Sequence, residues 1–165
     1  MQDSPFSTPR DQRYFDDYVA GSVHNFGPIT VSEDEVIAFA RRYDPQDFHT
    51  DPELARESIY GGLIASGWHT AAMMMRLLVD EYLSSVASLG SPGIDDLRWL
   101  QPVRPGDLLS VRVFILEARR SQSRPDRGVV RSAIEVCNQD GTVVMTMNAV
   151  NFFLTRDPQS DSINS

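Results

Sequence analysis

The chain has 165 residues, of which 41% are hydrophobic and 23% charged, and these values predict one globular domain. Its formal net charge of -8 excludes a general nucleic-acid binder, which needs a basic surface to displace counterions. The single cysteine, Cys137, excludes an internal disulfide and a cysteine-based zinc site, and we expect it in a strand. No apolar run reaches the length of about 18 residues that a membrane span needs, and the start "MQDSPFSTPR" is unlike a secretory signal, so we expect a cytoplasmic protein.

Both ends of the chain are short, polar segments. We expect residues 1–12 and 157–165 to be flexible tails. The intervening residues 13–156 contain neither an internal repeat nor an interior linker, and they predict a single domain.

The first half of the domain predicts a strand followed by helices. Residues 18–26 alternate loosely and predict a short strand. A helix is predicted over 33–43, because Ser32 and Glu35 match the S-x-x-E capping box and apolar residues then recur at helical spacing. Pro45 disfavours helical angles at Asp44, which therefore stands at the helix exit.

Two further helices are predicted before the chain changes period. Residues 51–58 predict one or two helical turns that begin at an Asp51 cap. A longer helix is predicted over 67–86 with Ser66 as its N-cap, and from Ala71 to Val79 its only charged residue is Arg76. A helix that is apolar on nearly every side is buried.

The second half predicts antiparallel strands. Four segments rich in β-branched and aromatic residues are separated by turn-forming sequences, and they span 93–103, 107–121, 127–138 and 142–155. A thoroughly apolar helix has to be surrounded, and a bent sheet can surround it. The predicted class is therefore α+β, with a curved antiparallel sheet wrapped around a central helix, as in the hotdog fold.

The stretch "YDPQDFHTDP", residues 43–52, carries the candidate catalytic residues. A carboxylate at Asp44 beside an imidazole at His49 can divide the acceptance and return of a proton. The alternative is a polar turn that ends the helix. Gly67 opens the long helix, whose first N–H groups have no partner within the helix and carry partial positive charge, so one of them could hold a developing oxyanion. Its alternative is a glycine that only relieves crowding.

The segment "DPQDFHTDPELA" followed by "GGLIASGW" resembles the MaoC-like dehydratases and (R)-specific enoyl-CoA hydratases. The family motif has an Asp, four residues and a His, continues into His-x-Asp and an Ala, and is followed by the glycine that opens the hotdog helix. The resemblance covers residues 16–155. The matching positions are Asp44, His49, Asp51, Ala55 and Gly67.

The resemblance implies a reversible syn addition of water to a trans-2-enoyl thioester. Asp44 and His49 would hold the water, and the Gly67 N–H would bind the thioester carbonyl. Three further residues, Ser66, Trp68 and Asp51, are candidate substrate contacts. The implied substrate is a coenzyme A thioester, with no metal and no redox cofactor, and the implied assembly is a homodimer or a dimer of dimers. The ligand would lie near the subunit interface, with its acyl chain in a tunnel beside the helix.

Three departures from the family pattern concern acyl specificity and turnover. Gln46-Asp47 stands where the family usually has Asn-Pro, Ser66 where a His often precedes the glycine, and Met75 near the position of a supporting Ser. A hotdog thioesterase and a non-catalytic acyl-CoA or lipid-binding protein remain as alternatives.

Other candidate residues have plainer interpretations. His24 and His69 are expected to be structural, and Trp99 is expected in the core or an interface, which is also the alternative for Trp68. Several arginines could meet coenzyme A phosphates, but solvated strand positions explain them equally well: Arg98, Arg104, Arg119 and Arg120.

Overall fold

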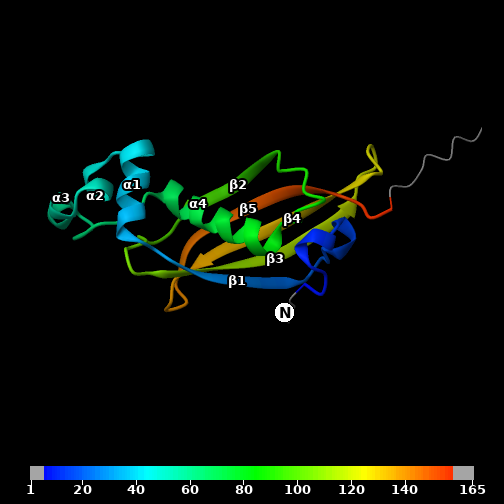
Figure 1. Cartoon of the computed structure of the whole chain (residues 1–165), viewed down its shortest axis with the longest axis horizontal. Coiled ribbons are helices and arrows are strands. Elements are labelled where there is room, and N and C mark those ends of the chain that lie inside the picture. The colour runs from blue at the N-terminus through cyan, green and yellow to red at the C-terminus, as the bar shows by residue number, and fades with distance from the viewer. Residues whose placement is uncertain (1–5, 158–165) are drawn as a thin grey trace, which may run out of the picture.

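A five-stranded antiparallel sheet curves around one central helix, α4, in the computed structural model, which describes residues 6–157 (Figure 1). The strand order is β1-β3-β4-β5-β2. This architecture confirms the predicted α+β hotdog fold. The strands are β1 (Val23–Thr30), β2 (Gly93–Trp99), β3 (Leu108–Arg120), β4 (Arg127–Cys137) and β5 (Val143–Leu154).

Strands β3, β4 and β5 form the predicted meander and supply most of the apolar face that covers α4. Along β3, Val111, Val113 and Ile115 are buried, whereas Arg112 between them is exposed. Such a period of two is what a strand with one buried face requires. Strand β1 pairs with β3 at one edge, and β2 pairs with β5 at the other. Cys137 is buried at the end of β4.

Three short helices gather at one end of the molecule, beyond the first turn of α4 (Figure 1). Helix α1 (Glu33–Tyr43) has the predicted bounds, and the hydroxyl of Ser32 accepts the Glu35 amide hydrogen at 3.5 Å. Helix α3 (Pro52–Glu57) begins at the predicted Asp51 cap. A one-turn helix that was not predicted, α2 (Asp47–Thr50), lies between them.

Helix α4 (Gly67–Leu77) continues through one π-helical turn, η3 (Leu78–Tyr82), and ends before the predicted residue 86. The residues that contact the end of this helix lie far away in the sequence. The guanidinium of Arg13 and the hydroxyl of Tyr18 both donate hydrogen bonds to the Tyr82 carbonyl, at 2.8 and 2.9 Å. These donors replace the next helical amides. None of the helices in residues 6–157 has both the length and the apolar character that a membrane crossing demands.

Residues 6–12, expected within a flexible tail, pack against the domain. The Phe6 ring stacks on His24 with centroids 4.0 Å apart, and Arg10 donates from Nε to the Leu83 carbonyl at 3.1 Å. Two short 3-10 turns follow, Arg10–Gln12 and Phe15–Asp17. The polar sequence concealed these long-range partners. The other parts of the expected tails, residues 1–5 and 158–165, lie outside the described residues.

Candidate active site

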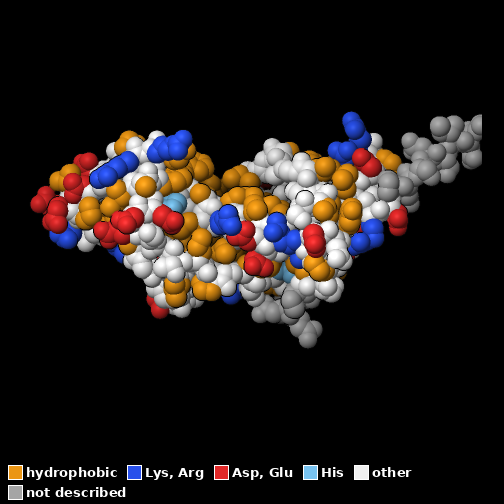
Figure 2. All heavy atoms as spheres, viewed as in Figure 1, with side chains coloured by type: hydrophobic (Ala, Val, Ile, Leu, Met, Phe, Trp, Pro, Cys, Tyr) orange, Lys and Arg blue, Asp and Glu red, His pale blue; other side chains and the backbone are white. Residues whose placement is uncertain are grey.

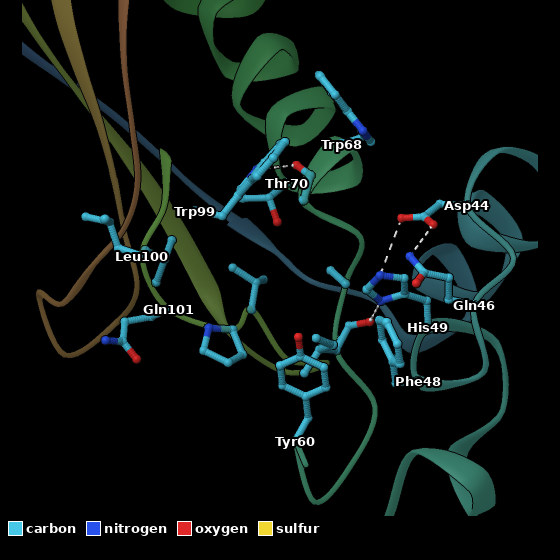
Figure 3. A pocket seen from close by; sticks show the side chains of 16 residues that line it. Asp44, Gln46, Phe48, His49, Tyr60, Trp68, Thr70, Trp99, Leu100 and Gln101 are labelled. Carbon is cyan, nitrogen blue, oxygen red and sulfur yellow. Dashed lines mark hydrogen bonds and ion pairs between the residues drawn. The ribbon is translucent and has the colours of Figure 1, made fainter. Parts of the chain in front are cut away.

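A cavity of about 530 Å³ lies where the α1–α3 end meets the first turn of α4 (Figure 3). The three predicted catalytic groups, Asp44, His49 and Gly67, all line it. Helices α1 and α2 deliver the first two residues, and the start of α4 delivers the third. The other lining residues are Gln46, Phe48, Tyr60, Ile64, Ala65, Trp68, Thr70, Trp99, Leu100, Gln101, Pro102, Val103 and Val144.

The carboxylate of Asp44 is held from three sides at the exit of α1. Its Oδ2 accepts a hydrogen bond from the Ser66 hydroxyl at 2.7 Å and lies 3.4 Å from Nε2 of His49. Its Oδ1 accepts a hydrogen bond from the Gln46 side-chain amide at 2.7 Å. These contacts fix the carboxylate with one edge toward the imidazole (Figure 3).

The imidazole of His49 is buried and has a fixed orientation. Its Nδ1 lies 2.8 Å from the carbonyl oxygen of Ile64. A carbonyl oxygen can only accept a hydrogen bond, so Nδ1 carries a proton whether the ring is neutral or charged. The nitrogen at which His49 gains or loses its proton is therefore Nε2, which faces Asp44.

The surroundings of Asp44 favour its ionised form. Burial raises the pKa of this carboxyl group. The hydrogen bonds from Ser66 and Gln46 and the nearby His49 lower the pKa, and their combined effect is larger than that of burial. The net pKa of Asp44 is below the ordinary value of 3.8. The stabilisation that accompanies this shift is present above the ordinary pKa and is lost as the pH falls through the folded-state pKa.

Replacing Ser66 with alanine is expected to raise the pKa of Asp44, because one of the two hydrogen bonds to the ionised carboxylate is removed. An NMR titration of the Asp44 carboxyl carbon measures this shift. Ser66 also caps α4, so its loss costs about 1 kcal/mol of stability by that route alone. Ser32→Ala is the matched control, because it removes the N-cap of α1 without touching Asp44. An unchanged Asp44 titration in Ser66→Ala would contradict the contact.

Gly67 lies in the first turn of α4 and lines the cavity. As the first residue of the helix, Gly67 has an N–H with no partner within the helix. The indole of Trp99 packs on this glycine, and its Nε1 donates to the Gly67 carbonyl at 2.9 Å. A Cβ at this position would meet the indole at 2.4 Å, so only glycine fits beneath Trp99.

Of the three residues predicted to contact the substrate, one lines the cavity and two do not. Trp68 lines the cavity and is 56% exposed. Ser66 is fully buried and is not among the lining residues; it contacts Asp44 and caps α4 instead. Asp51 also lies outside the lining, because its carboxylate caps α3 by accepting from the amides of Glu53 and Leu54, at 2.8 and 3.2 Å. Of the three predicted substrate contacts, Ser66 and Asp51 therefore lie outside the cavity lining, where they support Asp44 and cap helices.

The contacts that Gln46 and Trp99 make in the site were not predicted from the sequence. Gln46 occupies the slot where the resembling family has Asn, and an amide at that position was the available signal. Nothing local placed Trp99 here, because the end of β2 meets Gly67 only in the folded chain. Across residues 6–157, no group of three or more His, Cys, Asp or Glu side chains is placed to hold a metal ion.

The curved sheet around α4, with a facing Asp/His pair and a helix-opening glycine, defines a hotdog protein of the hydratase/dehydratase type. The chain belongs to the family described as MaoC like domain, which matches residues 18–136 and confirms the resemblance. It is similar to the crystal structure of the MaoC-like dehydratase from Rhodospirillum rubrum, with 39% identity and a TM-score of 0.80 over 88% of this chain and 99% of that chain.

Two other relatives are more distant. The chain is 28% identical over 124 residues to the uncharacterized protein YdeM of Bacillus subtilis (strain 168), which covers 75% of this chain and 86% of that protein. The structure of R-hydratase PhaJ1 from Pseudomonas aeruginosa has a TM-score of 0.70 at 23% identity, covering 87% of this chain and 86% of that chain. At this identity the likeness concerns the fold alone.

Proposed function

We propose that the protein is an acyl-CoA hydratase/dehydratase that adds water reversibly, with syn geometry, to a trans-2-enoyl thioester. The observation that supports this proposal best is the convergence of Asp44, His49 and the opening turn of α4 at Gly67 on one cavity. Membership of the MaoC-like family agrees with it.

The Gly67 amide would polarise the substrate. A thioester carbonyl that accepts its N–H lies at the positive end of α4. As water adds to the β-carbon, negative charge develops on this carbonyl oxygen in the enolate-like transition state. A fixed donor at that point stabilises the transition state more than the ground state.

Asp44 and His49 would accept a proton from the water and return a proton to the substrate. A water held between Asp44 Oδ2 and His49 Nε2 forms the new C–O bond at the β-carbon and gives up one proton to the pair. The π electrons move toward the thioester carbonyl, and a proton returns from the pair to the α-carbon. The net change is addition of one water, so no redox cofactor is required. Because the pair supplies both proton transfers, we propose a reaction without a metal.

Asp44 and His49 would not contribute equally. The hydrogen bonds to Asp44 favour the carboxylate, which then orients the water and balances charge on the imidazole. His49 can exchange a proton at Nε2 without losing its bond to Ile64. The two groups are coupled, so a kinetic pH profile will report the pair.

Crotonyl-CoA is the substrate with which to test the proposal. Loss of the ultraviolet absorbance of the conjugated enoyl thioester, without release of free thiol, is the expected result. Release of thiol would instead identify a thioesterase. Thermal stabilisation by crotonyl-CoA with neither signal would identify a binding protein that has no hydratase activity.

We also propose that a second copy of the chain covers α4 and β2. Three apolar side chains along α4 and its continuation η3, Trp68, Met75 and Val79, are 56%, 42% and 40% exposed. Figure 2 shows hydrophobic side chains over this part of the molecule, with basic and acidic side chains beside them. Strand β2 pairs only with β5 in the sheet, so its other edge can pair with a copy of itself about a twofold axis.

Val79→Glu is expected to convert the dimer into a monomer, because the new carboxylate would be buried without a partner. Size-exclusion chromatography with light scattering measures the change. Val19→Glu is the control, since Val19 is 61% exposed and lies outside this face. A wild-type protein with the mass of one chain would contradict the proposed assembly.

A further inference from the structure

We propose that the cavity admits only a short acyl group and that Trp99 sets its length limit. This inference rests on the proposed function, because that function places the thioester carbonyl at the Gly67 amide. It concerns the size of the acyl group, which the Asp/His pair does not determine.

The cavity has an open side and a closed inner end. Trp68, Leu100 and Gln101 on the open side are exposed. The inner end is formed by buried side chains, and most of them are small: Ile64, Ala65, Thr70, Val103 and Val144. The buried part of the cavity, which suits an acyl chain best, is therefore this inner end.

The cavity does not continue along the central helix. Among the lining residues, the one furthest along α4 is Thr70. One turn further on the same helical face, Met73 and Met74 are 5% and 4% exposed and belong to the core. Leu77 follows them in that core. The expected acyl tunnel beside the helix is filled by these side chains.

Trp99 forms one wall of the cavity beside Gly67. Its indole donates to the Gly67 carbonyl and makes an edge contact with Trp68, with ring centroids 5.1 Å apart and an interplanar angle of 78°. The indole also occupies the space into which a side chain at Gly67 would extend. A thioester bound at the Gly67 amide would therefore lie beside the indole, which Figure 3 shows next to the start of α4.

The wall continues from Trp99 through residues 100–103, opposite Asp44 and His49. An acyl chain that places its β-carbon near the pair is enclosed between the two walls. A short chain fits the inner end. A longer chain would have to displace the indole and break its hydrogen bond to the Gly67 carbonyl, which weakens binding.

Ligand binding and turnover with matched thioesters test this inference. The only two tryptophans, Trp68 and Trp99, both line the cavity, so intrinsic fluorescence reports occupancy directly. We expect the wild type to bind butyryl-CoA about tenfold more tightly than octanoyl-CoA, and to prefer crotonyl-CoA over octenoyl-CoA in kcat/KM by a similar factor. Trp99→Ala should shift both ratios toward the long chain by about tenfold or more.

Trp99→Phe provides a graded variant that keeps an aromatic wall, and it tests the limit if Trp99→Ala does not fold. Leu116→Ala is the control, because Leu116 is 58% exposed and does not line this cavity. Equal use of both chain lengths by the wild type, or unchanged ratios in both Trp99 variants, would overturn the length limit. Selective binding of butyryl-CoA without turnover would overturn hydration while supporting the limit.

Discussion

Asp44→Asn and His49→Gln are each expected to lower kcat for enoyl-CoA hydration by roughly 10²-fold or more, the usual contribution of general acid–base catalysis. Asparagine keeps the shape of Asp44 but loses its charge and its ability to accept a proton. Glutamine can still donate to the Ile64 carbonyl but has no Nε2 that titrates. Thermal unfolding should show that both variants retain the fold, because each substitution preserves side-chain volume approximately.

Asp51→Ala is the matched control within the same segment. It removes a carboxylate that caps α3, so it should cost about 1 kcal/mol of stability and leave kcat unchanged. Circular dichroism and steady-state kinetics on the three variants separate the two roles of aspartate. If Asp44→Asn unfolded the protein, or kept full turnover, the polar-turn interpretation of residues 43–52 would hold.

Local signals in the sequence were sufficient for most secondary structure. The Ser32 cap and Pro45 bracket α1, whose predicted and observed bounds agree. Turn residues separate the strands of the meander, and the alternation along β3 matches its burial. These features depend on residues within a few positions of one another, which is the range over which capping and turn chemistry act.

Long-range contacts explain two places where the secondary-structure predictions were wrong. The apolar pattern of the central helix continues past Tyr82. However, the Tyr82 carbonyl accepts hydrogen bonds from Arg13 and Tyr18, which lie more than sixty positions earlier in the sequence. The same contacts hold the start of the domain against the end of η3. A polar segment whose partners lie so far away has no local periodicity. Residues 6–12 were therefore predicted to belong to a flexible tail.

In the candidate site, too, the local features were predictable from the sequence and the long-range contacts were not. The Asp44–His49 spacing and the glycine after Ser66 were readable from the motif, and the structure brings them together. That Ser66 donates to Asp44 across 22 positions was not readable, nor was the packing of Trp99 on Gly67. Both depend on how α4 meets α1 and β2. The proposed limit on acyl-chain length depends on such contacts, because they shape the cavity and leave the motif unchanged.

Gly67→Ala is expected to lower kcat/KM for crotonyl-CoA by about 10²-fold, the scale of losing one oxyanion hydrogen bond. The new methyl group would lie 2.4 Å from the Trp99 indole, so either the indole or the first turn of α4 must move. A moved turn shifts the Gly67 N–H away from the carbonyl, and a displaced indole intrudes on the substrate. Stability should change less, because overpacking costs about 1–3 kcal/mol and alanine recovers up to about 1 kcal/mol in a helix.

The double variant Gly67→Ala with Trp99→Ala distinguishes these two causes. If the indole is the obstacle, its removal restores both the melting temperature and part of the turnover, and the two substitutions are strongly non-additive. If the methyl group itself covers the amide, stability returns but turnover does not. Gly93→Ala is the control, since a Cβ on Gly93 meets nothing within 4 Å. Full turnover in Gly67→Ala would contradict the proposed role of this amide, because a moved turn and a displaced indole are each expected to disturb its contact with the carbonyl.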